Sequence, residues 1–466
     1  MSTRRTSRVG VSPLFTKGCS YEFVSRQLAE ALLEGPWETE ALLARGRSFF
    51  GGRPRWLPAL IKRLIRHFGE SSRPRLFHLV AFLCIDEKFL FACGEENRRL
   101  HDQPHAQNRF LQAQTPLMAP AKGPPSSWDL HPLTTRAELA PWLALTPAEL
   151  AWFADVQSRG GKITEGPLTH YRYHWQPKAS GSARLIECPK SRLKAIQRRV
   201  LDEILAKIPP HDAAHGFRLG RSIRTYIEPH IGQYVVLKLD LRHFFPSVGF
   251  AQVLAVFRTA GYPEAVAQAL AGICTNAVPP RVWRDPACPL VGDELWRTRQ
   301  VFWRPHLPQG APSSPALANL CFRSLDARLS ALASMAGARY TRYADDLAFS
   351  GGPEFARGVD RFHIQVAAIA IEAGFAIQTR KTRLMRRGGR QKIGGVVVNE
   401  VPNVPRDDYD LLKATLYNCV RHGPEAQNRR KLPDFRAHLA GRVQYVATLN
   451  PARGRKLMSM FERIAW

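Results

Sequence analysis

The chain has 466 residues, which is long enough for several domain-sized units and a sizeable hydrophobic core. Its 67 Lys and Arg residues outnumber its 39 Asp and Glu residues, giving a formal net charge of +28, and 45% of its residues are hydrophobic. The hydrophobic content is that of a globular protein, and the charge favours a polyanionic partner, above all nucleic acid, over a basic surface that only keeps the protein soluble.

Cysteine spacing and apolar runs exclude several classes of protein. No CxxC pair occurs, so zinc-finger spacing is absent, and scattered cysteines in so long a chain argue against a disulfide framework. The N-terminal stretch MSTRRTSRVG lacks the apolar segment of a secretory signal, and the longest apolar run, residues 76–85, is about half the length that spans a bilayer. We therefore expect a cytoplasmic protein that does not enter a membrane.

The first 101 residues are predicted to form a helical N-terminal extension. Apolar residues recur at helical spacing between positions 57 and 68. The opposite face of this helix carries basic side chains: Lys62, Arg63, Arg66 and His67. This face fits either a surface helix on a core or a contact with nucleic acid. Residues 102–140 lack a steady period, contain several prolines and are predicted to form a linker or an extended wrap.

From residue 141 onwards the pattern alternates between helices and strands. Thr146, Pro147 and Glu149 form a helix start signal, with an N-cap, a proline at the first helical position and a capping-box acid. Strands or hairpins are predicted at 171–189, 234–248, 339–351 and 392–400, and helices at 191–208, 314–335 and 359–374. Residues 403–466 are predicted to be mostly helical.

Three aspartates occur where a strand pattern would exclude them. Asp240 stands alone in an apolar strand, and Asp345 and Asp346 lie side by side between apolar residues. A buried carboxylate without a partner is costly, and a divalent metal site would compensate all three. Mg²⁺ prefers hard oxygen ligands, and two such ions about 4 Å apart can activate a hydroxyl and neutralise a departing pyrophosphate. The alternative for Asp345 and Asp346 alone is an ordinary Asp-containing turn.

A proline-bounded loop precedes the aspartate pair. In LPQGAPSSPALANL (307–320), Gln309 and Gly310 would let the backbone approach a nucleotide closely. By itself this loop is an ordinary turn. The ordered set of the lone aspartate, this loop and the aspartate pair is far more specific than any one of its members.

The ordered set resembles the palm of a reverse transcriptase. LKLDLRHFFPSV resembles the first palm motif, LPQGAPSSPALANL the second, YADD the third and AGFAIQTRKT the fourth. AAHGFRLGRSI, QGAPSSP and ASGSARLIECPKSRLKAIQ are similar to bacterial retron enzymes, and the resemblance covers roughly residues 146–466. It implies an α+β right-hand polymerase with an antiparallel palm sheet after a mostly helical N-terminal region. The fingers and palm would occupy residues 141–402 and a helical thumb residues 403–466.

The resemblance also implies roles for single residues. Two Mg²⁺ ions would be held by Asp240, Asp345 and Asp346, the catalytic residues, with the Leu241 carbonyl joining them. Phe245 would block a nucleotide 2′-hydroxyl and select dNTPs, and Gln309 would touch the incoming sugar. Lys178 and Arg184 would hold the triphosphate, and Lys381 would protonate pyrophosphate. The alternatives are a core phenylalanine for Phe245 and solvated or backbone-binding cations for the lysines and the arginine.

A basic segment follows the aspartate pair. Residues 378–392 contain seven Lys or Arg residues and no acid, which suits phosphate contacts along an A-form helix, with a disordered basic loop as the alternative. The residues predicted to bind nucleic acid are Arg218, Arg221, His230, Arg380, Arg383, Arg386, Arg387, Arg390 and Lys392.

The resemblance further implies partners. The enzyme would copy part of a dedicated structured non-coding RNA, priming from a 2′-hydroxyl within it, and so bind template, primer, cDNA and dNTPs. A host ribonuclease H would trim the template, because only 67 residues follow Asn399. An effector protein would join it in antiphage defence.

Two signatures depart from the retron pattern. YIEPH (226–230) stands where Asn-Ala-x-x-His is typical, and IGG (393–395) stands where Val-Thr-Gly is typical. These departures leave two alternatives open: a non-retron defence-associated reverse transcriptase with another priming mode, and a non-catalytic RNA-binding protein on the same scaffold.

Overall fold

The computed structural model describes residues 21–50, 52–70, 74–92, 128–155, 169–177 and 183–466, and they form two compact units. The first unit contains the described residues up to 92 together with residues 132–150 and 257–269. The second contains residues 128–131, 151–256 and 270–466, apart from those not described. Most of residues 102–140, the predicted linker, lies outside the described residues.

The first unit is helical. Its helices before residue 151 are α1 (Tyr21–Leu32), α2 (Thr39–Phe49), α3 (Leu57–Phe68), α4 (Leu76–Ile85), α6 (Arg136–Trp142) and the start of α7 (Pro147–Ala154). Helix α3 buries Leu57, Leu60, Ile61 and Leu64, so the predicted apolar stripe faces the core of this unit. On the basic face, Arg63 forms an ion pair within the unit, with its Nε 2.7 Å from Asp86 Oδ2.

The predicted helix start at Thr146 is confirmed. Thr146 Oγ1 accepts from the Glu149 backbone N–H at 3.3 Å, and Glu149 Oε2 accepts from the Thr146 backbone N–H at 2.9 Å. This reciprocal pair satisfies two backbone donors that would otherwise lack partners at the helix N-terminus.

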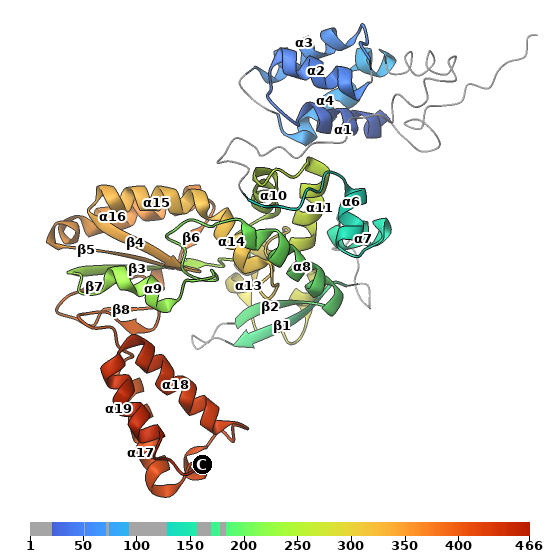
Figure 1. The fold of residues 1–466 in the computed structure, drawn as a ribbon. Coiled ribbons are helices and arrows are strands. Elements are labelled where there is room, and N and C mark those ends of the chain that lie inside the picture. The colour runs from blue at the N-terminus through green and yellow to red at the C-terminus, as the bar shows by residue number, and fades with distance from the viewer. Residues whose placement is uncertain (1–20, 51, 71–73, 93–127, 156–168, 178–182) are drawn as a thin grey trace, which may run out of the picture. The chain divides into compact units, whose positions relative to one another are not determined.

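The second unit carries both sheets and helices (Figure 1). Its strands are β1 (Tyr171–Pro177), β2 (Ala183–Pro189), β3 (Val235–Arg242), β4 (Ala338–Tyr343), β5 (Asp346–Gly351), β6 (Ala376–Ile377), β7 (Arg383–Arg386), β8 (Lys392–Ile393) and β9 (Val396–Val397). Its helices are α8 (Ser191–Glu203), α9 (Ile223–Ile227), α12 (Pro280–Arg284), α13 (Gly292–Phe302), α14 (Ser314–Cys321), α15 (Arg323–Met335), α16 (Pro353–Glu372), α17 (Arg406–His422), α18 (Phe435–Leu449) and α19 (Pro451–Phe461). Helices α10 (Phe250–Thr259) and α11 (Glu264–Cys274) connect the two units along the chain.

The main sheet is antiparallel. Its strand order is β4-β5-β3-β6, and β7 also pairs with β3. Helices α15 and α16 cover one face, and α9 lies on the other (Figure 1). An antiparallel sheet covered by helices after a helical N-terminal region confirms the predicted α+β class.

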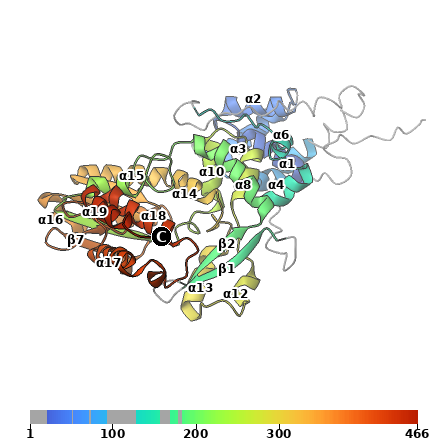
Figure 2. The same ribbon diagram turned by 60° about the horizontal axis from the view of Figure 1, so that its bottom comes forward.

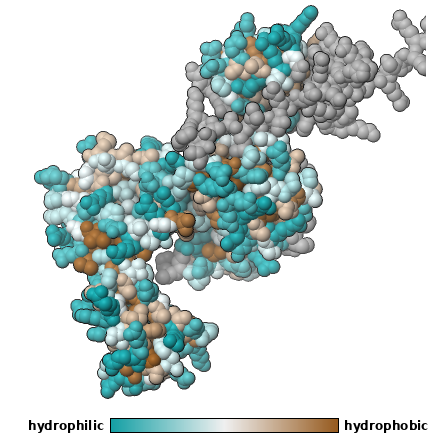
Figure 3. Space-filling view, viewed as in Figure 1, coloured by the Kyte–Doolittle hydropathy of each residue, from teal (hydrophilic) through white to brown (hydrophobic). Residues whose placement is uncertain are grey.

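The C-terminal helices pack on the sheet's second face. One buried cluster joins Tyr226 of the α9 segment and Val236 of β3 to Leu412 of α17, Val443 of α18 and Leu457 of α19. Because this apolar core is continuous, the helices from Arg406 onwards are anchored to the sheet. Figure 3 shows that the visible face of this unit is mostly hydrophilic with small apolar patches.

The β1–β2 hairpin forms a second, smaller sheet. The strands pair from Tyr171↔Pro189 to Pro177↔Ala183, as predicted for residues 171–189. Leu185 of β2 packs with Trp283 of α12 and Phe302 of α13. Both helices lie beside the hairpin in Figure 2.

Several predicted boundaries differ from the structure. The strand predicted to reach residue 248 ends at Arg242, because His243 takes a left-handed conformation with φ of 46°. The helix predicted at 314–335 is divided into α14 and α15 at Phe322, and the helix predicted from 359 begins at Pro353, where proline is tolerated in the first turn. Within the described residues, no helix has the length and apolar character needed to cross a membrane.

Candidate active site

The sheet brings the three predicted aspartates together. Strands β3 and β5 pair so that Asp240 lies directly opposite Asp346. Asp345 lies in the turn before β5, and its carbonyl accepts from the Leu241 N–H at 3.0 Å. Residues about 100 positions apart in the sequence therefore meet at one end of adjacent strands.

A buried ion pair supports the turn that carries Asp345. Arg342 is 0% exposed, and its Nε and Nη2 donate to the two carboxylate oxygens of Asp326 at 2.9 and 2.7 Å. Its Nη1 donates to Asn319 Oδ1 at 3.0 Å and to the Ala344 carbonyl at 3.1 Å. Ala344 has φ of 54°, an uncommon conformation for a residue with a side chain, so the arginine holds this turn at its tightest residue.

Burial and neighbouring carboxylates raise the pKa values of Asp345 and Asp346. Burial and the charge of Asp240 raise the pKa of Asp345, while Lys381 and Arg184 act to lower it. Burial raises the pKa of Asp346 to about 6; Lys238 opposes the shift, and the charges of Asp345 and Asp240 add to it. These carboxylates are crowded and partly dehydrated, an arrangement that favours a bound cation.

Two lysines supply positive charge at this position. Lys381 Nζ lies 2.9 and 3.0 Å from the two carboxylate oxygens of Asp240, and Lys238 Nζ lies 3.0 Å from Asp346 Oδ1. No cluster of three or more His, Cys, Asp or Glu side chains in the described part of the chain already has metal-binding geometry. The hard oxygen donors and their mutual repulsion nevertheless fit Mg²⁺, and the lysine ammonium groups stand in for that positive charge.

The predicted nucleotide loop is bound to the hairpin. The Gln309 carbonyl accepts from the Glu187 N–H at 2.9 Å, and the Gln309 N–H lies 3.4 Å from Glu187 Oε1. Gly310 has φ of 135°, and a Cβ atom there would lie 2.7 Å from the Glu187 carbonyl oxygen. The loop can therefore approach β2 this closely only because residue 310 is glycine.

Phe245 and Phe244 have different surroundings. Phe244 is 5% exposed and packs against Phe322, whereas Phe245 is only partly buried. The ring of Phe245 lies 6.2 Å from that of Phe217, which lies 6.4 Å from that of Tyr343. Phe217 is 51% exposed and has φ of 57°, so an exposed aromatic with an uncommon backbone conformation lies between Phe245 and Tyr343.

The structure describes two of the three cationic side chains that were predicted to contact the triphosphate or pyrophosphate. Arg184 is exposed on β2, and its charge acts on Asp345. Lys381 is 58% exposed while it contacts Asp240. Lys178 lies outside the described residues.

The basic segment 378–392 includes a strand. Strand β7 pairs with β3 from Arg383↔Lys238 to Arg386↔Val235, so this part of the segment belongs to the sheet rather than to a disordered loop. Its predicted nucleic-acid-binding residues are all exposed: Arg380, Arg383, Arg386, Arg387, Arg390 and Lys392. Arg218 and Arg221 share one carboxylate, with distances of 3.3 and 3.9 Å to Asp212 Oδ1.

The prediction for His230 is wrong in this structure. The ring is 0% exposed, and its nitrogens lie 2.6 Å from Ser350 Oγ and 2.7 Å from Thr341 Oγ1. Burial lowers the pKa of His230 to about 3, with the charges of His215 and Arg339 adding to the effect. A neutral histidine whose two nitrogens bond hydroxyls of β4 and β5 holds the turn after α9 to the sheet and does not reach nucleic acid.

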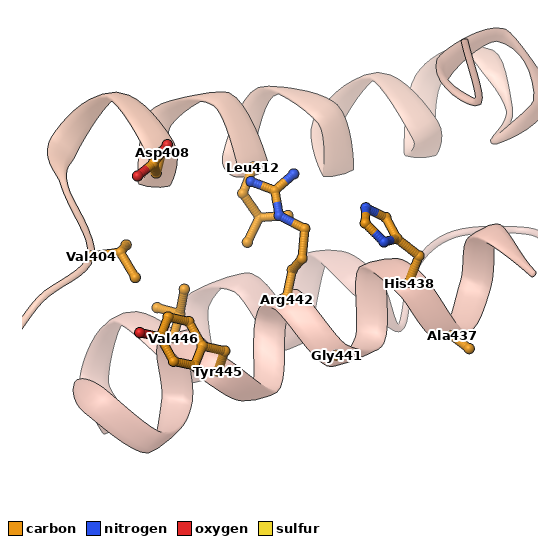
Figure 4. Close-up of a pocket in the computed structure, with 9 residues that line it drawn as sticks. All are labelled: Val404, Asp408, Leu412, Ala437, His438, Gly441, Arg442, Tyr445 and Val446. Carbon is orange, nitrogen blue, oxygen red and sulfur yellow. The ribbon is translucent and has the colours of Figure 1, made fainter. Parts of the chain in front are cut away.

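A groove lies between two C-terminal helices. It has a volume of about 500 Å³, and Figure 4 shows its lining residues: Val404, Asp408, Leu412, Ala437, His438, Gly441, Arg442, Tyr445 and Val446. His438 and Arg442 of α18 point towards α17 in this view. Tyr445 is 42% exposed. Partial burial raises the pKa of Tyr445, and an electrostatic interaction with Tyr343 adds to this increase.

Sequence reasoning missed several residues around the site. Lys238 could have been found, because it lies two positions before Asp240 and so on the same face of the strand. Arg342, next to the tyrosine of YADD, carries no pattern that predicts its burial. Glu187 and His306 are 119 positions apart and meet only in the folded chain.

Comparisons with known proteins identify the family to which the chain is similar. The profile of the reverse transcriptase (RNA-dependent DNA polymerase) family matches residues 176–412. The retron Mx65 reverse transcriptase of Myxococcus xanthus is 42% identical over 319 residues, 65% of this chain and 69% of that protein. The retron Mx162 reverse transcriptase of the same organism is 36% identical over 350 residues, 72% of this chain and 68% of that protein. The retron Ec86 reverse transcriptase of Escherichia coli is 28% identical over 282 residues, 60% of this chain and 76% of that protein.

Proposed function

This chain belongs to the retron reverse transcriptases and is an RNA-directed DNA polymerase, and we propose that Asp240, Asp345 and Asp346 carry its nucleotidyl transfer. The register that sets Asp240 opposite Asp346, with Asp345 in the adjoining turn, is the observation that supports this most strongly. Two Mg²⁺ ions bound there would activate the primer hydroxyl and neutralise the departing pyrophosphate. The chain's own part is to hold the three carboxylates in one place.

Neighbouring residues would bind and orient the nucleotide. Gln309 lies in a loop whose backbone is fixed to β2, so its side chain is presented from a rigid support. Phe245 would meet the 2′-carbon and select dNTPs. Arg184 and Lys178 would contact the triphosphate, and Lys381, now paired with Asp240, would move to donate a proton to pyrophosphate. The Leu241 carbonyl would be the remaining metal ligand.

The template and primer would follow the exposed basic surface. Strand β7 presents Arg383 and Arg386 beside β3, the strand that carries Asp240. The groove that contains His438, Arg442 and Tyr445 offers an arginine, an imidazole and a phenol ring on the C-terminal helices, the proposed thumb. Phosphate contacts of this kind bind an RNA–DNA duplex without reading its sequence.

The product would be a short single-stranded DNA joined to a dedicated structured RNA. The proposed partners are this RNA as template and primer, its cDNA, dNTPs, a host ribonuclease H that trims the template, and an effector protein that acts with the enzyme in antiphage defence. The proposed location is the cytoplasm. The proposed domains are a helical extension (1–101), a linker (102–140), fingers and palm (141–402) and a thumb (403–466).

One observation favours a related alternative. The two segments that depart from the retron signatures are neighbours, because a Cβ atom at Gly394 would lie 2.5 Å from Ile223 Cδ1 and 3.2 Å from Tyr226 Cε1. Departures that touch each other would alter one shared surface. A defence-associated reverse transcriptase with another priming mode fits this, whereas a non-catalytic scaffold fits poorly with three carboxylates in one place.

Nucleic acid that copurifies with the enzyme tests the proposal. The full chain should be purified from its native host beside a variant with Asp345→Ala and Asp346→Ala, and the bound nucleic acid sequenced. We expect a branched RNA–DNA molecule with the wild type and RNA alone with the variant. Unbranched cDNA would support the alternative priming mode, and cDNA that persists in the variant would contradict the catalytic assignment.

A further inference from the structure

A buried charge network joins the β1–β2 hairpin to the loop that carries Gln309. Glu187 is 0% exposed and His306 is 1% exposed, and His306 Nε2 lies 3.0 Å from Glu187 Oε1. Asn276 Nδ2 donates to Glu187 Oε2 at 2.7 Å and lies 3.1 Å from Tyr173 Oη. A charged group this deeply buried is costly unless it is paired, so the network calls for a function or a strong structural reason.

The hydrogen bonds fit an ionised pair. His306 Nδ1 lies 2.7 Å from the Arg304 carbonyl, which only accepts, so this nitrogen carries a proton. The carboxylate of Glu187 accepts from Asn276 and lies within reach of the Gln309 N–H, so both of its oxygens act as acceptors. With Glu187 ionised, as a carboxylic acid ordinarily is at neutral pH, the remaining nitrogen of His306 also donates, and the ring is an imidazolium beside a carboxylate.

Electrostatics agrees with this reading of the geometry. Burial alone would lower the pKa of His306, but the charge of Glu187, the hydrogen bond to it and the Arg304 carbonyl together raise it. The other ionisable groups around the network are Tyr171 and Tyr173 of β1, Cys274 at the end of α11 and Arg281 of α12. Burial raises the pKa values of both tyrosines and of Cys274, so His306 is the group of this set that loses its proton at the lowest pH.

The network reaches the nucleotide loop through the backbone. Residues 304–310 are pinned on two sides: His306 exchanges backbone hydrogen bonds with Asn276 at 2.9 and 3.0 Å, and the Leu307 N–H donates to Val248 O at 3.0 Å. The Gln309 carbonyl accepts from the Glu187 backbone N–H, and the Gln309 N–H faces the Glu187 carboxylate. The ion pair therefore lies where the loop begins, and its Glu187 also holds Gln309 further along the loop.

We propose that Glu187 and His306 are positioning residues, which hold the Gln309 loop in its nucleotide-binding conformation while His306 is protonated. This inference rests on the proposed contact of Gln309 with the incoming nucleotide. When His306 loses its proton, the ion pair and one hydrogen bond to Glu187 are lost, and the loop loosens. Because the folded pKa of His306 is raised, this support is complete below the ordinary histidine pKa and disappears as the pH rises through the folded value.

Nucleotide kinetics at several pH values test the proposal. The full chain extends oligo(dT) on poly(rA) with Mg²⁺ and varied dTTP, beside Glu187→Gln and His306→Gln. We expect each variant to raise the KM for dTTP about tenfold with little change in kcat, since a charge-assisted hydrogen bond that supports binding is lost. The wild-type KM should rise as the pH increases above the ordinary histidine pKa of about 6.5, and the KM of both variants should stay flat.

A matched control separates positioning from general loss of stability. Tyr171 lies on the same hairpin as Glu187, and its buried hydroxyl accepts from Gln197 at 2.9 Å. Tyr171→Phe removes this hydroxyl, which no described bond joins to the Gln309 loop. It should lower the melting temperature and leave the KM unchanged. If Glu187→Gln or His306→Gln behaves in the same way, the proposal is wrong.

The remaining outcomes are also decisive. If both network variants fail to fold, the wild-type pH profile still decides, because a KM that stays flat across this range contradicts the role of His306. If the wild type extends the primer and the variants match it, this inference fails while the proposed function stands. If Asp345→Ala with Asp346→Ala extends the primer as well as the wild type does, the proposed catalytic site fails instead.

Discussion

Two segments of the second unit are each held by a buried ion pair, but the chemistry of the two pairs differs. The turn with Asp345 depends on Arg342 and Asp326, both 0% exposed. The loop with Gln309 depends on His306 and Glu187, which are 1% and 0% exposed. An arginine does not lose its proton at any pH a protein meets, whereas a histidine does.

The difference suggests a division of work. The carboxylates that would hold metal must stay in one geometry at every working pH, and a permanent guanidinium with four hydrogen bonds fixes that turn. The nucleotide must bind and leave at every addition, so a support that can loosen is tolerated in the Gln309 loop. The comparison predicts a large pH-independent effect at the turn and a smaller pH-dependent effect at the loop.

The largest expected effect comes from Arg342→Gln. This change leaves Asp326 buried without its counter-charge and frees the Ala344 carbonyl, so we expect a loss of about 3–5 kcal/mol in the free energy of unfolding. Chemical denaturation measures this loss. Arg339→Gln is the control, since Arg339 lies three positions earlier and exposed, donating to the Pro229 carbonyl at 3.0 Å. Equal losses in the two variants would break the comparison.

A smaller effect is expected at the aromatic pair that follows β3. Phe245→Ala should lower the preference for dTTP over UTP by about 10–100-fold, because the ring would no longer exclude a 2′-hydroxyl. The measurement is the ratio of kcat/KM for the two nucleotides on poly(rA). Phe244→Ala is the control: this buried ring packs on Phe322, so its loss should reduce stability and leave the ratio unchanged. If the ratio falls only in the control, Phe244 and not Phe245 excludes the 2′-hydroxyl, and the proposed role of Phe245 is wrong.

The sequence predicted the parts of the site that follow local rules. Asp240 is conspicuous because it breaks an apolar strand, and Asp345 and Asp346 because they are adjacent. Their meeting point needed only the pairing of two strands, which the strand pattern already indicated. Lys238 follows from the same period of two.

The remaining parts depend on tertiary packing. His230 was predicted to bind nucleic acid because it matches the histidine of the Asn-Ala-x-x-His signature, yet the fold buries it between two hydroxyls. Glu187 and His306 belong to segments with no shared pattern, and only the approach of β2 to the Gln309 loop pairs them. Buried ion pairs between distant segments are therefore the features that sequence patterns reveal least.

The most direct test of the account is single-nucleotide incorporation by the wild type and by Asp240→Asn. Asparagine keeps the shape of Asp240 and removes the charge that would bind metal, so the variant should fold and show at least about a thousandfold lower Mg²⁺-dependent rate. Thermal unfolding of both proteins confirms that the variant is folded. Incorporation by a folded Asp240→Asn at the wild-type rate would contradict the proposed carboxylate site.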